Sequence, residues 1–413
     1  DTMLVDQDLF GGYYSQFGLD DLVRRWLGKY MDKSGRDEFE GRESLSLKMR
    51  KYATNDAVAT LAVAGKQAAY IKEHDEPLNC YFDIDELMIQ STLAMKPVRV
   101  DVDAWMDFAK ENMAQAAKLE AELGFNPKSP KQVMEVLHKF GFKVKSSDEA
   151  TLQKCLEKAR NDKQRELIKA IMNVRMYRDA VSKYGAGWIE KNVEEGGLVY
   201  ANWKIVGAET GRMSCRSPNL QQIPARELPI FRSFFVAAKG HRLIISDVKQ
   251  QEPRIAAWFS QDGRMKNDVQ TGDVYTPIAK EFGIERFQAK VVFLGITYGA
   301  QEGTVARELG CSNAEAARLL NALHRRYAVH MAWIGRTRLN ANRVGFVRTA
   351  DGRRVWVNPY SYQAANNAIN APIQGSAAGM TKRAVNNMYL TMPEFCVSMV
   401  IHDEVVAEVA GGR

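Results

Sequence analysis

The spacing of apolar positions predicts helices throughout the first half of the chain. Apolar residues recur three or four positions apart from about Phe10 to Tyr70, with one stripe over Leu19–Leu27 and a small-residue run over Ala53–Ala69. The same spacing returns over Val102–Leu123 and, with many Lys and Arg, over Thr151–Val193. These segments are therefore expected to form amphipathic helices.

Ser129 and Pro130 predict the start of a further helix after the loop that begins at Asn126. Serine is a favoured N-cap because its hydroxyl accepts a hydrogen bond from a free backbone N–H of the first turn. Proline is favoured at the first helical position, where its missing N–H costs nothing.

From Leu198 onward, short apolar runs typical of strands alternate with helical segments. The expected strands are Leu198–Val206, Leu243–Ser246, Val355–Val357 and Val397–Val400. This mixture predicts an α+β fold. The run before Asp247 is expected to be a buried strand, and the acids after Val400 are expected at the tip of a tight hairpin.

Composition narrows the class of protein. The chain has 413 residues, 46% hydrophobic, with 57 Lys+Arg against 50 Asp+Glu and a net charge of +7. Such a chain is globular, forms two to four domains, and is compatible with a nucleic-acid partner. No run of about 18 apolar residues is present and the first residues are acidic, so we expect no membrane segment and a cytoplasmic location. Five cysteines without a CxxC pair and six histidines without HxxxH exclude a zinc framework of thiolates or imidazoles.

Two aspartates are candidate metal ligands. Asp247 ends one expected strand, and Asp403 lies between His402 and Glu404 after another. Carboxylates that meet from distant parts of a sequence repel each other unless a cation lies between them, and oxygen-ligated Mg²⁺ is the usual one. Asp247 as a helix N-cap and Asp403 as a turn residue remain open alternatives.

One predicted helix has a face suited to a nucleoside triphosphate. Arg286, Lys290, Leu294 and Tyr298 are four residues apart and share a face that is cationic at its start and apolar to aromatic further on. Phosphates would meet the cations and the helix N-terminus, and the base and sugar would lie over the rest. An amphipathic helix whose cations reach solvent remains the alternative.

Several segments together resemble family A DNA polymerases, the bacterial DNA polymerase I type. They follow the family's order. TGRMSCRSPNLQQIP (210–224) is similar to the family's TGRLSS..PNLQNIP, DVKQQEPR (247–254) to DYSQIELR (motif A), the helix from Arg286 to RR.AK..NFG..YG (motif B), NAPIQGSAA (370–378) to NAP.QG.AAD, and HDE (402–404) to VHDE (motif C).

The resemblance implies a right-hand polymerase with an antiparallel palm sheet and helical fingers and thumb. It also implies that the C-terminal part of an α/β 3′-5′ exonuclease domain precedes them. The expected divisions are 1–75 exonuclease part, 76–197 thumb and palm entry, 198–265 palm with motif A, 266–340 fingers with motif B, and 341–413 palm with motif C.

The implied reaction is template-directed addition of deoxynucleotides to a primer 3′-hydroxyl, with release of pyrophosphate. Asp247 and Asp403 would hold two Mg²⁺ ions, with Mn²⁺ as a substitute, and Lys290 and Glu404 complete the catalytic set. The implied nucleotide-binding residues are Arg286, Lys290, Leu294, Tyr298, Glu252 and Gln250, with Glu252 excluding a ribose 2′-hydroxyl. The implied DNA-binding residues are Arg212, Asn219, Gln221, Arg232, Asn370, Gln374, His402, Lys128 and Lys131.

Structural roles remain open for several of these residues. Arg212 could be an ordinary strand-end cation, Gln374 or His402 a satisfied buried polar group, and any single lysine of the thumb a solvated charge. The expected partners are primer-template DNA, dNTPs and replisome proteins. A catalytically idle DNA-binding factor of polymerase shape and a mainly exonucleolytic protein are the alternatives in function.

The first residues resemble the proofreading exonucleases of the family. Tyr52 and Asp56 fit their Tyr-x3-Asp element, and Asp1 lies in a segment similar to one with another metal aspartate. The Asp-x-Glu element would lie before residue 1, so exonuclease activity is expected only of an intact domain, and a residual domain without activity is the alternative.

Departures from the family pattern predict a phage origin and altered sugar discrimination. Leu294 stands where Phe or Tyr is usual, after Phe293 where Asn is usual. Val248, Pro253 and Asn366 also depart from the pattern. The chain is also shorter than the family by a small loop before Arg286, and its tail after Val409 is short, so residues are expected to be missing at both places. Use of modified bases such as 2-aminoadenine is left open.

Overall fold

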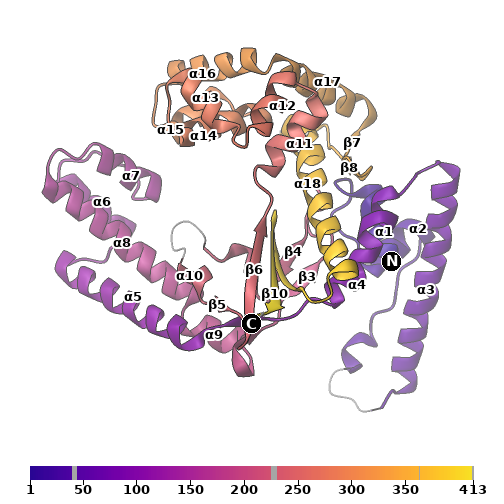
Figure 1. Cartoon of the computed structure of the whole chain (residues 1–413). Coiled ribbons are helices and arrows are strands. Elements are labelled where there is room, and N and C mark those ends of the chain that lie inside the picture. The colour runs from indigo at the N-terminus through magenta and orange to yellow at the C-terminus, as the bar shows by residue number, and fades with distance from the viewer. Residues whose placement is uncertain (40–43, 225–229, 362, 412–413) are drawn as a thin grey trace. The chain divides into compact units, whose positions relative to one another are not determined.

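The computed structural model describes residues 1–39, 44–224, 230–361 and 363–411 (Figure 1). The chain forms two compact units. The first unit contains Asp1–Lys96, Asn202–Arg216 and Ile244–Val409, and the second contains Pro97–Ala201, Ser217–Leu243 and Ala410–Arg413, of which residues 412–413 lie outside the described part. Helices and short antiparallel sheets occur in both, which confirms the α+β expectation.

The second unit is built on two long helices that pack along each other, α5 (Val102–Leu123) and α8 (Asp162–Tyr184). Its other elements are α6 (Pro130–Lys139), α7 (Glu149–Glu157), α9 (Ala186–Asn192), α10 (Ile230–Ser233) and a sheet in the order β2 (Leu198–Val199), β1 (Val98–Val100), β5 (Phe235–Val236). The bounds of α5 are those predicted. Ser129 caps α6 as expected, because its hydroxyl accepts the N–H of Gln132 at 3.4 Å.

Aromatic side chains form the core beneath these helices. Trp105 is fully buried and stacks on Trp188 at 4.6 Å between ring centroids. Its indole N–H donates to the carbonyl oxygen of Tyr184 at 2.7 Å, so the polar atom of this buried ring is satisfied.

The first unit begins with α1 (Thr2–Phe10), α2 (Leu19–Leu27), α3 (Leu47–Glu73), a π-helical segment (Tyr81–Asp85) and α4 (Glu86–Leu93). The predicted stripe of α2 is confirmed, since Leu22 and Val23 are buried against Val63 of α3. Among the described residues, no helix combines the length and the low polarity that crossing a bilayer requires.

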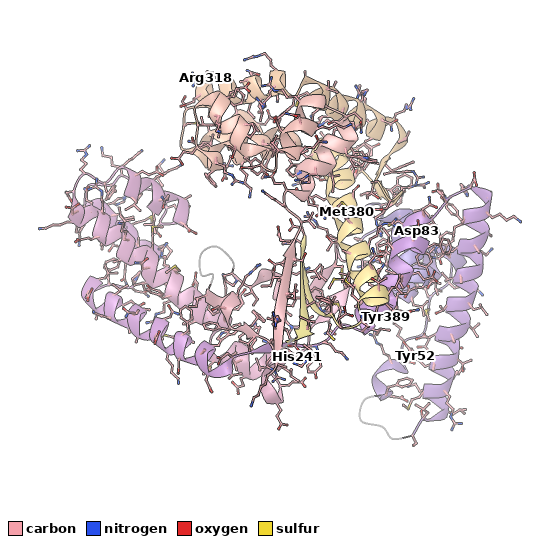
Figure 2. All side chains as sticks on the ribbon, in the orientation of Figure 1. Tyr52, Asp83, His241, Arg318, Met380 and Tyr389 are labelled. Atoms are coloured by element: carbon pink, nitrogen blue, oxygen red, sulfur yellow. The ribbon has the colours of Figure 1, made fainter. Side chains whose placement is uncertain are left out.

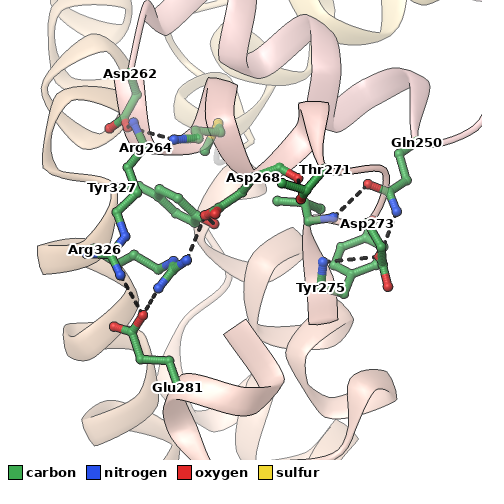
Figure 3. A network of polar contacts seen from close by, with 12 residues as sticks. Gln250, Asp262, Arg264, Asp268, Thr271, Asp273, Tyr275, Glu281, Arg326 and Tyr327 are labelled. Carbon is green, nitrogen blue, oxygen red and sulfur yellow. Dashed lines mark hydrogen bonds and ion pairs between the residues drawn. The ribbon is translucent and has the colours of Figure 1, made fainter. Parts of the chain in front are cut away.

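A helical cluster in the first unit surrounds one large core. Its helices are α11 (Gln251–Ser260), α12 (Gly263–Gln270), α13 (Tyr275–Phe282), α14 (Arg286–Tyr298), α15 (Glu302–Leu309), α16 (Asn313–Arg326) and α17 (Ala328–Val344). Asp268 is buried and accepts hydrogen bonds from Arg326 Nη2 and from the Tyr327 hydroxyl, both at 2.7 Å (Figure 3). This pairing fixes α12 against the junction of α16 and α17.

Three small sheets and a 28-residue helix complete the first unit. The sheets are β6 (His241–Asp247), β10 (Glu404–Ala410) and β9 (Cys396–Ile401) in that order, β3 (Asn202–Lys204) with β4 (Ser214–Arg216), and β7 (Phe346–Arg348) with β8 (Arg354–Trp356). The long helix is α18 (Ala364–Thr391). Strand β6 begins in the second unit and ends in the first.

The predicted burial of the strand before Asp247 is wrong. Strand β6 is mostly exposed, and the side chain of Ile245 is 63% exposed. It is the edge strand of its sheet and pairs only with β10, whereas β9 and β10 are largely buried. An apolar run alone cannot distinguish a central strand from an edge strand.

His330 on α17 is a buried imidazole with an unusual environment. It is fully buried and stacks on Trp333 at 5.5 Å between ring centroids. Among the described residues, neither ring nitrogen has a hydrogen-bond partner. Burial lowers the pKa of His330 to about 4, although Asp262 acts in the opposite direction. The folded protein therefore holds this ring neutral at pH values at which the unfolded chain is protonated.

We expect the free energy of unfolding to fall between pH 7.5 and pH 5 by about 2 kcal/mol on account of His330. The unfolded histidine titrates near 6.5 and the folded one near 4, so the unfolded state binds more protons throughout this range. A His330→Phe variant should lack this contribution and be more stable than the wild type at pH 5. Urea unfolding at both pH values measures the difference, and equal pH slopes for the two proteins would contradict it.

Candidate active site

The two aspartates predicted as metal ligands lie at adjacent strand ends. Asp247 ends β6, and Asp403 lies in the two-residue turn between β9 and β10. The backbone N–H of Val248 donates to the carbonyl oxygen of Asp403 at 3.3 Å and joins the two ends. His402 has a left-handed φ of 59°, which such tight hairpins require. The predicted hairpin is confirmed, and Glu404 opens β10 opposite Ile401.

The electrostatics of this pair suit a divalent cation. Partial burial and the negative charge of Asp403 raise the pKa of Asp247. A hard cation between two neighbouring carboxylates offsets their repulsion, and Mg²⁺ prefers carboxylate oxygens. The donor set at Asp247 and Asp403 therefore fits Mg²⁺.

Helix α14 begins at Arg286 as predicted, ends at Tyr298 and presents the predicted face. Arg286 is exposed at its N-terminal end, and Lys290, Leu294 and Tyr298 follow as half-buried side chains. Leu294 packs against the core of the helical cluster. Phe293 is fully buried in the same core, edge-on to the rings of Tyr275 and Tyr327, so its departure from the family pattern serves the core.

Glu252 forms one polar group with three other predicted residues from distant segments. Arg212 Nη2 donates to Glu252 Oε1, and the Tyr298 hydroxyl donates to Glu252 Oε2. Gln374 also bonds to the Tyr298 hydroxyl, whose pKa is raised by burial first and by Glu252 second. Arg212 is therefore no isolated strand-end cation: it forms an ion pair within the site.

A close backbone approach makes this meeting possible. Gly375, next to Gln374 on α18, lies so near Thr210 that a Cβ there would be 2.8 Å from the Thr210 carbonyl oxygen. Only glycine allows α18 to lie this close to the segment that carries Arg212.

Gln250 was predicted to bind nucleotide, but its amide is bonded within the protein. Its Nε2 donates to Asp273 Oδ1 at 2.7 Å, and its Oε1 accepts the N–H of Val274 at 3.0 Å (Figure 3). Asp273 in turn pairs with Arg286, with Nε 2.7 Å from Oδ2.

Sequence reasoning missed Asp273, although it is a partner of two predicted residues. A Gly-Asp pair just before a helical run signals a helix start, and Asp273 accepts the N–H of Tyr275 at the start of α13. That signal identifies a turn and cannot reveal a contact with Arg286.

The remaining predicted DNA-binding residues lie in both units. In the first unit, Asn370 on α18 is half-buried, and its Oδ1 finds no hydrogen-bond partner within the part of the chain that the structure describes. In the second, Asn219 accepts the N–H of Gln221 at 3.0 Å, and Lys128 pairs with Asp179 at 2.9 Å. Lys131 is exposed on the first turn of α6 and Arg232 lies on α10.

The predicted exonuclease residues do not all come together. Tyr52, labelled in Figure 2, and Asp56 lie on α3 and line a cavity of about 720 Å³ with Asp20. Asp1 instead caps α1, accepting the N–H groups of Met3 and Leu4.

The start of α1 contacts α3 far from that cavity. Gln67 donates to the carbonyl oxygen of Thr2 at 2.9 Å. Gln67 lies three helical turns beyond Asp56, about 16 Å along the axis. The expected grouping of Asp1 with Tyr52 and Asp56 therefore does not form.

A buried acidic group lies elsewhere in the first unit. Ligand atoms of Asp8, Cys80 and Asp85 lie within 4.8 Å of one another. Arg353 contacts both carboxylates, and Lys382 Nζ donates to Asp85 at 2.8 Å. Burial raises the pKa of Cys80 to about 12, so this thiol stays protonated. Two protein cations already neutralise the acids, which makes the group a structural ion-pair cluster.

The fold is that of a nucleic-acid polymerase domain. The structure matches the POL domain of Pol1 from M. smegmatis, which was solved in complex with DNA primer-template and dNTP. The TM-score is 0.83 and the sequence identity is 24%. The match covers 100% of this chain and 76% of the M. smegmatis chain. The right-hand polymerase fold is thereby shown.

The model of DNA polymerase family A matches residues 101–413, so the chain belongs to that family. Its relatives include DNA polymerase I of Caldicellulosiruptor bescii, 31% identical over 75% of this chain and 40% of the relative. DNA polymerase I of Rhizobium leguminosarum is 28% identical over 99% of this chain and 44% of the relative. The chain thus spans less than half the length of these two relatives.

Proposed function

We propose that the protein is a template-directed DNA polymerase that adds deoxynucleotides to a primer 3′-hydroxyl and releases pyrophosphate. One observation carries the proposal: the segment after Asp247 is bonded to both ends of α14. Gln250 reaches Arg286 through Asp273, and Glu252 bonds Tyr298 directly. A nucleotide lying along α14 would therefore extend beside the carboxylate of Asp247.

Each end of α14 suits one part of a nucleotide. The exposed guanidinium of Arg286 and the ammonium of Lys290 would bind the triphosphate, together with the helix N-terminus. Lys290 Nζ is also the proton donor proposed for the leaving pyrophosphate. Magnesium held by Asp247 and Asp403 would favour ionisation of the primer hydroxyl and stabilise the leaving group.

At the C-terminal end of α14, Glu252 and the residues bonded to it would select the sugar of the nucleotide. Arg212 and Tyr298 hold the Glu252 carboxylate from two sides. The Glu252 side chain is held in place and cannot move to make room for a ribose 2′-hydroxyl. A deoxyribose lacks this hydroxyl and would fit. Gln374, Asn370 and His402 would contact the primer end and the minor groove, whose acceptors vary little with sequence.

A Leu294→Phe variant should discriminate more strongly between deoxy and dideoxy nucleotides than the wild type. Leu294 is half-buried on the nucleotide face of α14, and a larger ring there would narrow the space for the sugar. We expect a change of about tenfold in the ratio of kcat/KM values, since one packing contact contributes 1–3 kcal/mol. Single-nucleotide incorporation measures it, and equal ratios for both proteins would contradict it.

Primer extension tests the proposal. A primed template with four dNTPs and Mg²⁺ should be extended, and affinity for the duplex should fall with salt and vary little with sequence, as phosphate contacts by Lys128 and Lys131 predict. Binding without extension would favour the idle DNA-binding factor. Shortening of the primer without dNTPs would favour a mainly exonucleolytic protein, for which Tyr52 and Asp56 in one cavity are the supporting feature.

The division into palm, fingers, thumb and exonuclease part stays a prediction. Proofreading in the intact protein, a phage origin, a cytoplasmic location and replisome partners also stay predictions.

A further inference from the structure

The carboxylate of Asp273 accepts hydrogen bonds from three groups besides Arg286. Asp273 lies between α12 and α13, outside the five segments compared above with the family's motifs. Gln250 Nε2 donates to its Oδ1 at 2.7 Å, the N–H of Tyr275 at 3.2 Å, and the Thr276 hydroxyl donates to its Oδ2. These three bonds fix the carboxylate whether or not Arg286 is present.

Arg286 approaches this anchored carboxylate from the side. Its Nε donates to Oδ2 at 2.7 Å and its Nη2 to Oδ1 at 3.1 Å. Its guanidinium carbon also lies 5.3 Å from the centre of the Tyr275 ring. The Arg286 side chain is 56% exposed, and among the bonds of the described residues its Nη1 has no protein acceptor.

We propose that Asp273 is a positioning residue that holds the Arg286 guanidinium ready for the triphosphate of the incoming nucleotide. This inference rests on the proposed polymerase function. A guanidinium carries five N–H donors in a fixed plane, and Asp273 uses the edge formed by Nε and Nη2. The end formed by Nη1 and Nη2 remains available for two parallel bonds to a phosphate.

The anchoring of Asp273 explains why its negative charge does not simply oppose the triphosphate. Burial raises the pKa of Asp273, but the hydrogen bonds from Arg286 and Thr276 outweigh burial and hold it well below its usual range. The carboxylate is therefore ionised at neutral pH, and its charge is matched by Arg286. A long half-exposed side chain that is already ordered loses less conformational freedom when phosphate binds.

Gln250 extends this arrangement to the catalytic carboxylates. It follows Asp247 by three residues, and its amide bonds both Asp273 and the N–H of Val274. The position of Arg286 is thereby tied to the segment that carries Asp247. The distance between the triphosphate subsite and the metal ligands is fixed by this chain of contacts.

Steady-state nucleotide incorporation with four proteins tests the proposal: wild type, Asp273→Asn, Arg286→Gln and the double variant. We expect Asp273→Asn alone to raise KM for dNTP about tenfold, equivalent to about 1.4 kcal/mol, with kcat within about twofold. In the Arg286→Gln background, the effect of Asp273→Asn on KM should have the opposite sign. There Asp273 is an unpaired anion beside the triphosphate, so removing its charge should lower KM about threefold.

Two results would overturn the proposal. A lower KM for Asp273→Asn alone would mean that the carboxylate only repels the nucleotide. An equal rise of KM in both backgrounds would mean that it only shapes the loop.

Controls separate this inference from the proposed function. Arg264→Gln removes another exposed ion pair of the same helical cluster, Arg264 with Glu281 at 2.7 Å, and should leave KM within about twofold. Primer-template affinity and melting temperature should be alike in all variants. An unchanged KM in Arg286→Gln would overturn the triphosphate role of Arg286, and this inference with it. A wild type that fails to extend primers would overturn the polymerase proposal itself.

Discussion

Replacing Asp247 with asparagine is expected to reduce kcat for nucleotide addition at least about a thousandfold, a loss of about 4 kcal/mol of transition-state stabilisation. Asparagine keeps the shape of the side chain but removes the anionic oxygen that would hold Mg²⁺ beside Asp403. The DNA-binding residues are untouched, so primer-template affinity should stay within about threefold. Single-turnover incorporation and a binding titration measure the two quantities.

The same substitution should not destabilise the protein. Partial burial and the charge of Asp403 raise the pKa of Asp247, so the ionised carboxylate is less stable in the folded protein than in the unfolded chain. Removing that charge should leave the free energy of unfolding unchanged or slightly higher, as expected where a functional group is kept at a cost in stability. Asp107→Asn, which changes an acid 69% exposed on α5, is the matched control and should retain activity. Appreciable extension by the Asp247 variant would contradict the assignment.

Periodicity predicted helices well where one face is buried and the ends are marked. The bounds of α5 agree with the prediction and α14 begins at the predicted residue, because apolar spacing and capping residues act locally. The hairpin that carries Asp403 could also be predicted from the sequence, since two short apolar runs flank two turn residues.

Contacts between distant segments could not be predicted in this way. The exposure of Ile245 depends on which strand lies at the sheet edge, and the pairing of Arg286 with Asp273 depends on how α13 packs beside α14. Gln250 shows the same limit, because its motif position predicts a contact with nucleotide but does not reveal that its amide bonds Asp273. Residue type at a motif position identifies the available chemistry, and the tertiary structure decides its partner.

Replacing Asp85 with alanine is expected to lower the free energy of unfolding of the first unit by about 3–5 kcal/mol. Asp85 ends the π-helical segment before α4 and its side chain is fully buried. It accepts hydrogen bonds from Arg353 and from Lys382, whose side chains are 4% and 2% exposed. Burial raises the pKa of Asp85, but these two cations outweigh burial and hold it below its usual value. Without Asp85, only the Asp8 carboxylate would remain for both cations.

Asp83 on the same segment provides the control for this loss (Figure 2). Its side chain is 58% exposed and lies 3.8 Å from Arg383, so Asp83→Ala should change stability by no more than about 0.5 kcal/mol. Adding Lys382→Met to Asp85→Ala should restore part of the loss, because it removes a cation left without its partner. Urea unfolding followed by circular dichroism measures all three variants. Equal midpoints for Asp85→Ala and Asp83→Ala would show that the buried ion-pair cluster does not hold the π-helical segment to Arg353 and α18.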